Sequence, residues 1–343
     1  MAKSDRILTI GGKPVIDLAA VRAIYRRNVW EPGSIGDKYL AAMKRNENKM
    51  AEHGVNSPLC CAHFLAQALL ETGGFQFTEE NLNYSSADRL RKVFPKKYPA
   101  HADAALHVGK PELVANHVYA QKNGNIEADD GWRYRGRGIF QLTGRANYQF
   151  YGEIIGVDLV ENPDLVASDF DISVRVALAY WRQTGLASYA EGNDARAVSR
   201  GINLGDPTRT GKANHLPERI WLTYRVIDKL EEPARSQILA QMTADAVLDI
   251  GDSGDDVRQL QVDLNRLYAN SVKPDGVFGK ATYEAVIGFQ AKAGLVPADG
   301  RVTVNVRCAI DEALGNNRDS PASNESKQVK RIKRRKRRSR SKR

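Results

Sequence analysis

An apolar helical run that ends abruptly at an acid constrains this 343-residue chain more than any other stretch. The apolar side chains of residues 64–69 fall on one side of a predicted helix, and a Gly-Gly break follows shortly after Glu71. His63, Gln67 and Glu71 recur every four residues on another side. Because unpaired polar groups are costly to bury, this polar stripe needs partners or a wet cleft.

Two further acids, Glu79 and Glu80, lie in the polar segment after the break. Burial at a helix end is expected to raise the pKa of Glu71, whereas an acid in an open loop is expected to stay ionised. Two carboxyl groups in unlike environments are what glycoside hydrolysis requires, one to protonate the leaving oxygen and one to activate water. The alternative for Glu71 is an ordinary last helical residue, although an acid there opposes the helix dipole.

Residues 132–148 alternate Arg, Gly and aromatic side chains and then offer hydrogen-bonding groups. The glycines allow the backbone to pass close to a ligand or to another segment. Neither a Walker lysine nor a full dinucleotide fingerprint is present, which disfavours a nucleotide-binding loop. Amides and hydroxyls beside aromatic rings suit an extended, hydroxyl-rich ligand such as a glycan. The candidate polar side chains are Gln141, Thr143 and Asn147.

Three motifs occur in order: Glu71-Thr-Gly-Gly-Phe, Glu80-Asn-Leu-Asn-Tyr-Ser and Arg135-Gly-Arg-Gly-Ile-Phe-Gln-Leu-Thr-Gly-Arg-Ala-Asn-Tyr. Together they resemble the family 19 glycoside hydrolases, the chitinase-like group that includes many phage endolysins. The resemblance covers roughly residues 35–228. It implies a mainly α fold with a lysozyme-like helical catalytic domain.

The resemblance also implies roles for individual residues. Glu71 matches the general acid and Glu80 the general base, while Thr143, with Gln141 and Asn147, falls where the family positions water and holds the sugar. Asn203 matches a substrate-contacting asparagine, although the family's Asn-Gly-Gly is Asn-Leu-Gly here.

Glu79 is the rival of Glu80 for the role of base. Neighbours in an extended segment point to opposite sides, so only one is expected to face the cleft. The family spacing from Glu71 favours Glu80. The implied reaction is a single displacement with inversion, with the carboxyl groups about 6.5–9.5 Å apart to leave room for water. It implies no metal and no organic cofactor.

A second unit, residues 247–314, reads as three short helices. Its first helix has an apolar face that begins at Val257, with Asp252 or Ser253 as the expected cap, and the Asp275-Gly276 turn is echoed by Asp299-Gly300. The pattern resembles the peptidoglycan-binding module of cell-wall hydrolases. The acids of residues 249–256 do not follow EF-hand positions, which disfavours a calcium loop.

The cysteines do not suggest a disulfide framework or a metal site. Cys60, Cys61 and His63 could suggest a metal site, but the two cysteines point about 100° apart on a helix and no fourth ligand occurs at a recognisable spacing. The two cysteines are therefore expected to pack in the core. Cys308 belongs to the downstream unit. The expected organisation is an N-terminal segment 1–34, a catalytic domain 35–230, a linker 231–246, a wall-binding domain 247–314 and a disordered basic tail 315–343.

The tail holds most of the positive charge. Residues 327–343 contain 12 Lys and Arg and no acids, so the formal charge of +10 leaves −2 for residues 1–326. Such a run self-repels and is expected to be disordered and to bind anionic outer-membrane or wall polymers. Nucleic acid is disfavoured as its partner, because the resemblance to a nucleic-acid-binding tract is compositional only.

These features predict a phage-type endolysin that cuts the β-1,4-linked glycan of peptidoglycan, with chitinase or a non-catalytic wall-binding virion protein as alternatives. A nucleic-acid-binding protein would rest on the tail alone. The amino terminus lacks the apolar region of a signal peptide. We therefore expect the protein to be made in the host cytoplasm and to act at the periplasm or cell wall. We also expect it to be a monomer. Whether muramic acid or glucosamine carries the new reducing end does not follow from the sequence.

Overall fold

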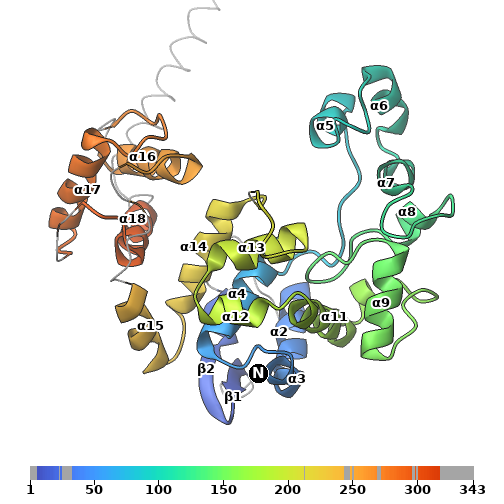
Figure 1. The fold of residues 1–343 in the computed structure, drawn as a ribbon, viewed down its shortest axis with the longest axis horizontal. Helices are drawn as coiled ribbons and strands as arrows, with labels where there is room; N and C mark the ends of the chain where they lie inside the picture. The colour runs from blue at the N-terminus through green and yellow to red at the C-terminus, as the bar shows by residue number, and fades with distance from the viewer. Residues whose placement is uncertain are drawn as a thin grey trace, which may run out of the picture. The chain divides into compact units, whose positions relative to one another are not determined.

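The computed structural model describes residues 6–22, 24, 33–211, 213–242, 248, 251–268, 272–295, 298 and 300–316. The chain forms two compact units, Met1–Arg235 and Ser236–Arg343, which are described separately below (Figure 1). Helices dominate both units, which confirms the predicted mainly α class. None of the described helices is long and apolar enough to cross a membrane.

The first unit contains one β-hairpin and a series of mostly short helices. Its elements are β1 (Ile7–Ile10), β2 (Lys13–Asp17), α1 (Leu18–Arg22), α2 (Ile35–Arg45), α3 (Glu47–Glu52), α4 (Pro58–Glu71), α5 (Ala87–Val93), α6 (His101–His107), α7 (Pro111–Tyr119), α8 (Asp130–Arg133), α9 (Arg145–Ile155), α10 (Leu165–Ser168), α11 (Phe170–Gln183), α12 (Leu186–Glu191), α13 (Ala195–Leu204) and α14 (Leu216–Ile227). The next helix, α15 (Ala234–Met242), begins in the expected linker and crosses the boundary between the units.

The hairpin belongs to the N-terminal segment that was expected to precede the catalytic domain. Strand β1 pairs antiparallel with β2, and Leu8 lies opposite Ile16. Thr9 donates from N and from Oγ1 to Glu47 Oε2 of α3, at 3.2 and 3.0 Å. Strand β2 also packs against α4, so the described part of this segment is built into the first unit.

Helix α4 is the central buried element of the first unit. Ser57 caps it by accepting from Cys60 N, and Pro58 occupies its first turn, where the missing N–H costs nothing. It packs most extensively against α14. Cys60 and Cys61 are fully buried and unpaired by disulfide, as predicted, and burial raises the pKa of both thiols.

The end of α4 is a tight backbone turn. Gly73, Gly74 and Phe75 all have positive φ, at 59°, 79° and 59°. The Thr72 hydroxyl secures the turn by donating to Ala68 O at 2.6 Å and accepting from Phe75 N at 2.8 Å. The predicted Gly-Gly break is therefore a structured reversal that sends the chain from α4 into the segment carrying Glu79 and Glu80.

Two apolar clusters support the rest of the first unit. The first cluster combines apolar side chains of α9 and α11 with those of Tyr134 and Leu142. Helices α5, α6 and α7 form a lobe around a second cluster, which includes Leu90, Tyr98 and Val114 (Figure 1). Trp181 is fully buried beside Phe64, at 5.6 Å between ring centroids, so its predicted core role is confirmed. The side chain of Trp221, predicted to be core as well, lies outside the described residues.

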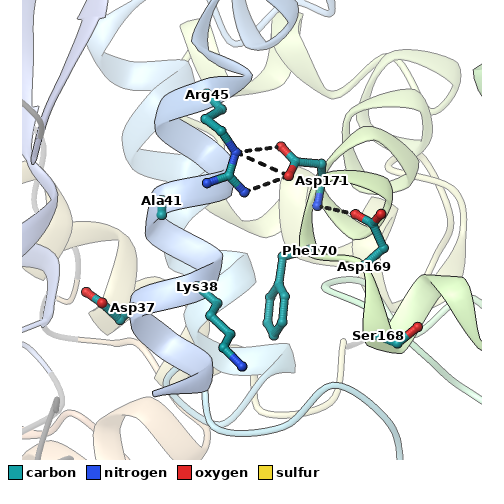
Figure 2. A pocket seen from close by; sticks show the side chains of 8 residues that line it. All are labelled: Asp37, Lys38, Ala41, Arg45, Ser168, Asp169, Phe170 and Asp171. Atoms are coloured by element: carbon teal, nitrogen blue, oxygen red, sulfur yellow. Dashed lines mark hydrogen bonds and ion pairs between the residues drawn. The ribbon is translucent and has the colours of Figure 1, made fainter. Parts of the chain in front are cut away.

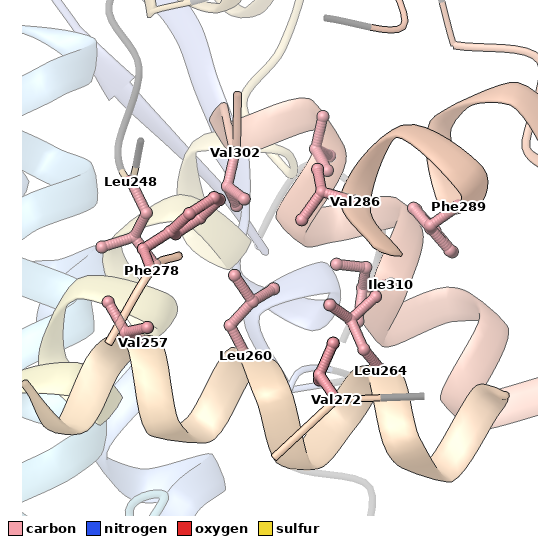
Figure 3. Close-up of a cluster of buried hydrophobic side chains, with 11 residues drawn as sticks. Leu248, Val257, Leu260, Leu264, Val272, Phe278, Val286, Phe289, Val302 and Ile310 are labelled. Atoms are coloured by element: carbon pink, nitrogen blue, oxygen red, sulfur yellow. The ribbon is translucent and has the colours of Figure 1, made fainter. Parts of the chain in front are cut away.

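The second unit contains α16 (Asp255–Leu267), α17 (Lys280–Lys292) and α18 (Val304–Asn316) around one core. Figure 3 shows Leu260 and Leu264 of α16 facing Val286 of α17 and Ile310 of α18. The three predicted helices are confirmed. The predicted cap position is wrong, because the N-cap residue of α16 is Gly254 rather than Asp252 or Ser253.

A glutamine binds the backbone N–H of each of two glycines in the second unit, Gly276 and Gly300. Gln261 Oε1 accepts from Gly276 N at 2.8 Å, and its amide donates to Val277 O at 3.0 Å. Gln290 repeats the arrangement with Gly300 N at 2.8 Å. The glycines of the two Asp-Gly pairs therefore have the same kind of partner. Residues 317–343, which include the basic tail, lie outside the described residues.

Candidate active site

Glu71 is the last residue of α4 and is held by a buried arginine from α14. Arg219 donates from Nη2 to Glu71 Oε1; 2% of the Arg219 side chain and 18% of the Glu71 side chain are exposed. The same guanidinium donates to Gln67 Oε1 at 2.5 Å and to Asn214 O at 2.9 Å. Among the described residues nothing donates to Glu71 Oε2, which leaves that oxygen available to a ligand.

The remaining member of the polar stripe on α4, His63, also has a polar partner. His63 Nε2 lies 2.9 Å from Asn193 Oδ1, and complete burial lowers the pKa of His63 to about 4. All three stripe residues thus have polar partners from outside α4. The expectation that this stripe needs partners is confirmed, and they come from α14 and from the turn after α12.

Glu80 lies in an extended segment that pairs with residues 136–138. Its peptide N–H donates to Gly136 O at 2.9 Å, and Gly136 N donates back to Glu80 Oε1 at 2.6 Å. Tyr119 Oη donates to the other carboxylate oxygen, Oε2, at 2.6 Å. Burial raises the pKa of Glu80. The hydrogen bonds that its carboxylate accepts from Gly136 N and Tyr119 Oη favour the ionised form and oppose that rise.

Three polar atoms converge on one side of Gly136. A Cβ at this position would lie 3.0 Å from Gln141 Oε1, and 3.2 Å from both Glu80 Oε1 and Thr143 Oγ1. A side chain at this position would therefore require these three atoms to shift by a few tenths of an ångström. The predicted Glu80, Gln141 and Thr143 are brought together in one site.

Hydrogen bonds fix the orientation of the predicted polar residues in this group. Thr143 Oγ1 donates to Gln141 O at 2.8 Å, which leaves the hydroxyl oxygen as an acceptor. Gln141 has φ of 52°, a left-handed conformation uncommon outside glycine, and its amide donates to Gly138 O at 3.0 Å. Asn147 donates from Nδ2 to Thr143 O at 2.8 Å. Strained backbone of this kind is often found at functional sites.

Asn203 belongs to the Glu71 side of the site. It lies at the end of α13, and its Oδ1 accepts from Asn214 N at 2.8 Å. Asn214 O in turn accepts from Arg219, which holds Glu71. The predicted substrate-binding Asn203 is therefore linked to the Glu71 carboxyl through two residues rather than to the group around Gly136.

Glu79, the rival of Glu80, has different partners. Its carboxylate accepts from Arg135 Nη2 at 2.7 Å and lies 3.7 Å from Arg137 Nε. The Arg135 guanidinium also stacks on the Trp132 ring, 4.0 Å from its centroid. The two neighbouring acids thus engage separate sets of groups, as expected for an extended segment.

The environments of the carboxyl groups differ from the sequence-based expectation. Glu80, expected to be an ordinary ionised loop acid, is the one whose pKa burial raises. The reason is that residues 136–143 and Tyr119 of α7 close over it. Glu71, expected to be a desolvated helix end, is instead ion-paired with Arg219.

Aromatic packing connects the two sides of the site. Phe140, which precedes Gln141, lies 5.3 Å from Phe64 of α4 and 6.0 Å from Tyr180 of α11, measured between ring centroids. A backbone hydrogen bond also links the Gln141 segment to the chain that follows α4, because Gly138 N donates to Thr78 O at 2.7 Å. These contacts hold the segment that carries Gln141 and Thr143 against the helix that ends in Glu71.

Two site residues were missed by sequence reasoning. Arg219 could have been suspected, because a cation occurs on the face of α14 that also carries Leu216, Ile220 and Thr223, at helical spacing. Tyr119 carried no comparable signal, since an aromatic at the end of an amphipathic helix is ordinary core composition.

A surface pocket of about 360 Å³ lies elsewhere in the first unit, between α2 and the start of α11. Figure 2 shows Arg45 engaging Asp171 and the Lys38 ammonium directed toward the Phe170 ring. Neither Glu71 nor Glu80 lines this pocket, so it is separate from the candidate site described above. Among the described residues no group of His, Cys, Asp or Glu has the arrangement of a metal site.

Comparison with known proteins identifies the family. Residues 106–192 match the family model of chitinase class I, and residues 253–310 match that of a peptidoglycan binding domain. A glycosyl hydrolase family 19 domain-containing protein of Haemophilus influenzae is 43% identical over 146 residues, which are 42% of this chain and 70% of that relative. The chain belongs to glycosyl hydrolase family 19. It is therefore a glycosidase that also carries a peptidoglycan-binding domain.

The chain is also similar to chitinases from a plant and from a bacterium. Acidic endochitinase Q of Nicotiana tabacum is 53% identical over 53 residues, 16% of this chain and 21% of that protein. The structure of chitinase C from Streptomyces griseus aligns with a TM-score of 0.40 at 19% identity, covering 61% of this chain and 90% of that one. The matched residues 106–192 contain Gln141, Thr143 and Asn147 but neither Glu71 nor Glu80.

Proposed function

We propose that this family 19 enzyme is an endolysin that hydrolyses the β-1,4-glycosidic bonds of peptidoglycan by a single displacement with inversion. The observation that carries the proposal is the convergence of Glu80, Thr143 and Gln141 on Gly136, on the same chain as a peptidoglycan-binding domain. A carboxylate, a hydroxyl acceptor and an amide around one small space suit the binding of a water molecule beside a sugar.

In this proposal Glu80 is the general base and Thr143 orients the attacking water. The Thr143 hydrogen is committed to Gln141 O, so its oxygen accepts one hydrogen of the water. Glu80 Oε1 accepts the other hydrogen and removes it as the bond to the sugar forms. Both hydrogens of the water are thereby engaged, which directs an oxygen lone pair toward the anomeric carbon.

Glu71 is the proposed general acid. Arg219 holds Oε1, so the proton is carried on Oε2 and passes from there to the leaving glycosidic oxygen. Two observations support this role. The Glu71-Thr-Gly-Gly-Phe motif resembles that of the family 19 enzymes, and Arg219 engages only one of the two carboxyl oxygens of Glu71. Gln141 Oε1, Asn147 Oδ1 and the Asn203 amide are the groups proposed to contact the sugars.

The second unit and the tail are proposed to determine where the enzyme acts. Binding of the second unit to the wall raises the effective concentration of the glycosidase on its substrate. The 12 Lys and Arg of residues 327–343 are proposed to bind anionic outer-membrane or wall polymers. These roles fit phage lysis, with action at the periplasm or cell wall.

Product analysis of digested sacculi tests the proposal. Mass spectrometry with reducing-end labelling should detect new glycan ends and identify the sugar that carries them. Chitin, the alternative substrate, should be cleaved more slowly than sacculi at equal enzyme concentration. Faster cleavage of chitin would favour the chitinase alternative, and no cleavage of either would favour a non-catalytic wall-binding protein.

A further inference from the structure

The lobe formed by α5, α6 and α7 concentrates positive charge within the folded part of the chain. Residues 87–122 contain seven Lys and Arg against three Asp and Glu, a net charge of +4, although residues 1–326 together sum to −2. The remainder of residues 1–326 is therefore acidic, at −6. An anionic ligand that reaches the first unit would be attracted to this lobe.

Two lysines of the lobe, Lys97 and Lys122, have backbone groups bonded to the C-terminal end of α7. His117 Nε2 donates to Lys97 O at 2.7 Å, and the Lys122 peptide N–H donates to Tyr119 O at 3.2 Å. Partial desolvation and the neighbouring Lys97 ammonium lower the pKa of Lys122. Within the described parts of the chain neither lysine has a carboxylate in ion-pair distance, so the repulsion between them is not offset.

The loop that presents the second of these lysines is held in an unusual conformation. Gln121 and Asn123 have φ of 57° and 49°, a region that residues other than glycine seldom adopt. Asn123 O accepts from Ala146 N at 2.9 Å, and a Cβ on Gly144 would lie only 2.3 Å from Asn123 Cβ. The loop is therefore pressed against the segment that carries Thr143.

Tyr119 connects the lysine pair to the hydrolytic group. It is the last residue of α7, its Oη donates to Glu80 Oε2 at 2.6 Å, and Lys122 follows three residues later in the same turn. The Lys122 side chain is exposed and that of Lys97 is half-buried. Both lysines thus belong to the lobe that contacts Glu80 through Tyr119, and Lys122 lies in the turn that directly follows that tyrosine.

We propose that Lys97 and Lys122 form an anion subsite that binds the carboxylates of the lactyl-peptide substituents of peptidoglycan. The inference rests on the proposed peptidoglycan hydrolase function and deepens it. Chitin has the same β-1,4-linked backbone but no carboxylate, so it leaves the two cations unpaired. The subsite therefore favours peptidoglycan over chitin through charge, independently of the wall-binding unit.

The test compares soluble glycan strands that carry intact stem peptides with the same strands after their carboxylates have been coupled to ethanolamine. The full-length Lys97→Gln/Lys122→Gln variant should lose roughly 5-fold in kcat/KM on intact strands, as expected for two partly exposed ion pairs. On the neutralised strands it should match the wild type. The wild-type preference for intact strands should also shrink as salt screens the charges.

Two further variants separate charge from structure. Lys97→Arg/Lys122→Arg retains both charges and should stay within about 2-fold of the wild type on both strand types. Lys13→Gln/Lys49→Gln removes the same charge from β2 and α3 and should leave both rates unchanged. An equal loss on intact and neutralised strands, or no loss on intact strands, would overturn the subsite while leaving the proposed function intact. Failure of the wild type to cleave intact strands would overturn both.

Discussion

The Tyr119 phenol donates a hydrogen bond to Glu80 Oε2 across 2.6 Å, so the last residue of α7 holds the carboxylate that we propose as the general base. The opposite oxygen accepts from Gly136 N. Burial nevertheless raises the pKa of Glu80 from its ordinary value. The environment of this carboxylate thus balances desolvation against two donors, and that balance should be visible in the pH dependence of catalysis.

Tyr119→Phe should move the acidic limb of the kcat/KM profile to higher pH. Glu80 must be ionised to act as base, and its hydrogen bond from Tyr119 favours the ionised form, so removing that bond raises the pKa further. A shift of about 1 pH unit corresponds to the loss of one hydrogen bond to a charged group. Tyr189→Phe on α12 is the matched control. An acidic limb that stays in place would remove Glu80 from the role of base.

Glu80→Gln should reduce glycan hydrolysis by at least about 1,000-fold, whereas Glu79→Gln should reduce it by less than about 10-fold. The amide at position 80 cannot take a proton from water, but at position 79 it loses only the ion pair with Arg135. Initial rates on soluble glycan strands provide the comparison, and circular dichroism checks the fold. The reverse order of severity would assign the base to Glu79.

Arg219→Gln should impair both activity and stability. The buried guanidinium donates to Gln67, Asn214 and Glu71, so its loss leaves several buried acceptors without a donor. Breaking a buried ion pair of this kind costs about 3 kcal/mol in the free energy of unfolding. Glu71→Gln should be equally inactive but less destabilised, because an amide oxygen still accepts from Arg219. Urea unfolding followed by fluorescence distinguishes the two variants; full activity of Arg219→Gln would exclude its role in holding the acid.

The sequence predicts the two local parts of the site, the polar stripe of α4 and the group around Gly136. It predicts less well the contacts between residues that are far apart in the chain. The stripe of His63, Gln67 and Glu71 follows from helical periodicity alone. Its partner Arg219 is 148 residues beyond Glu71, and only the packing of α14 on α4 brings the two together. The cation on the inner face of α14 was visible in the sequence, but nothing local indicated which acid it would pair with.

The protonation behaviour of the site could not be predicted for the same reason. Glu80 was expected to be an open loop acid because its neighbours in the chain are polar. Its desolvation comes from Gly136 and Thr143, and from Tyr119 of the α5–α7 lobe, 39 residues away. Motif spacing brought the right residue types into consideration, whereas burial depends on tertiary packing that spacing does not encode.

The free energy of unfolding should fall as the pH decreases from about 6.5 to about 4, partly because of His63. Its pKa is lowered to about 4 in the folded protein, so the unfolded state binds the proton more readily, and stability is lost as pH falls through this window. This one group accounts for about 3 kcal/mol. His63→Gln should lower stability at neutral pH but flatten the pH dependence, as measured by urea unfolding at several pH values. An unchanged slope would show that His63 is not buried in its neutral form.

Separating the two units should divide catalysis from wall association. A fragment of residues 1–235 contains every proposed catalytic and sugar-binding residue and should cleave soluble glycan strands at the full-length rate. On intact sacculi at low enzyme concentration it should be slower by about 10-fold or more, because tethering raises the local concentration of the glycosidase without adding new chemistry. Raising the enzyme concentration should close the gap, since untethered encounters then become frequent. The full chain without residues 327–343 is the control that assigns the gap to the second unit rather than to the basic tail. If the fragment matches the full chain on sacculi at every concentration, the second unit does not tether the enzyme to its substrate.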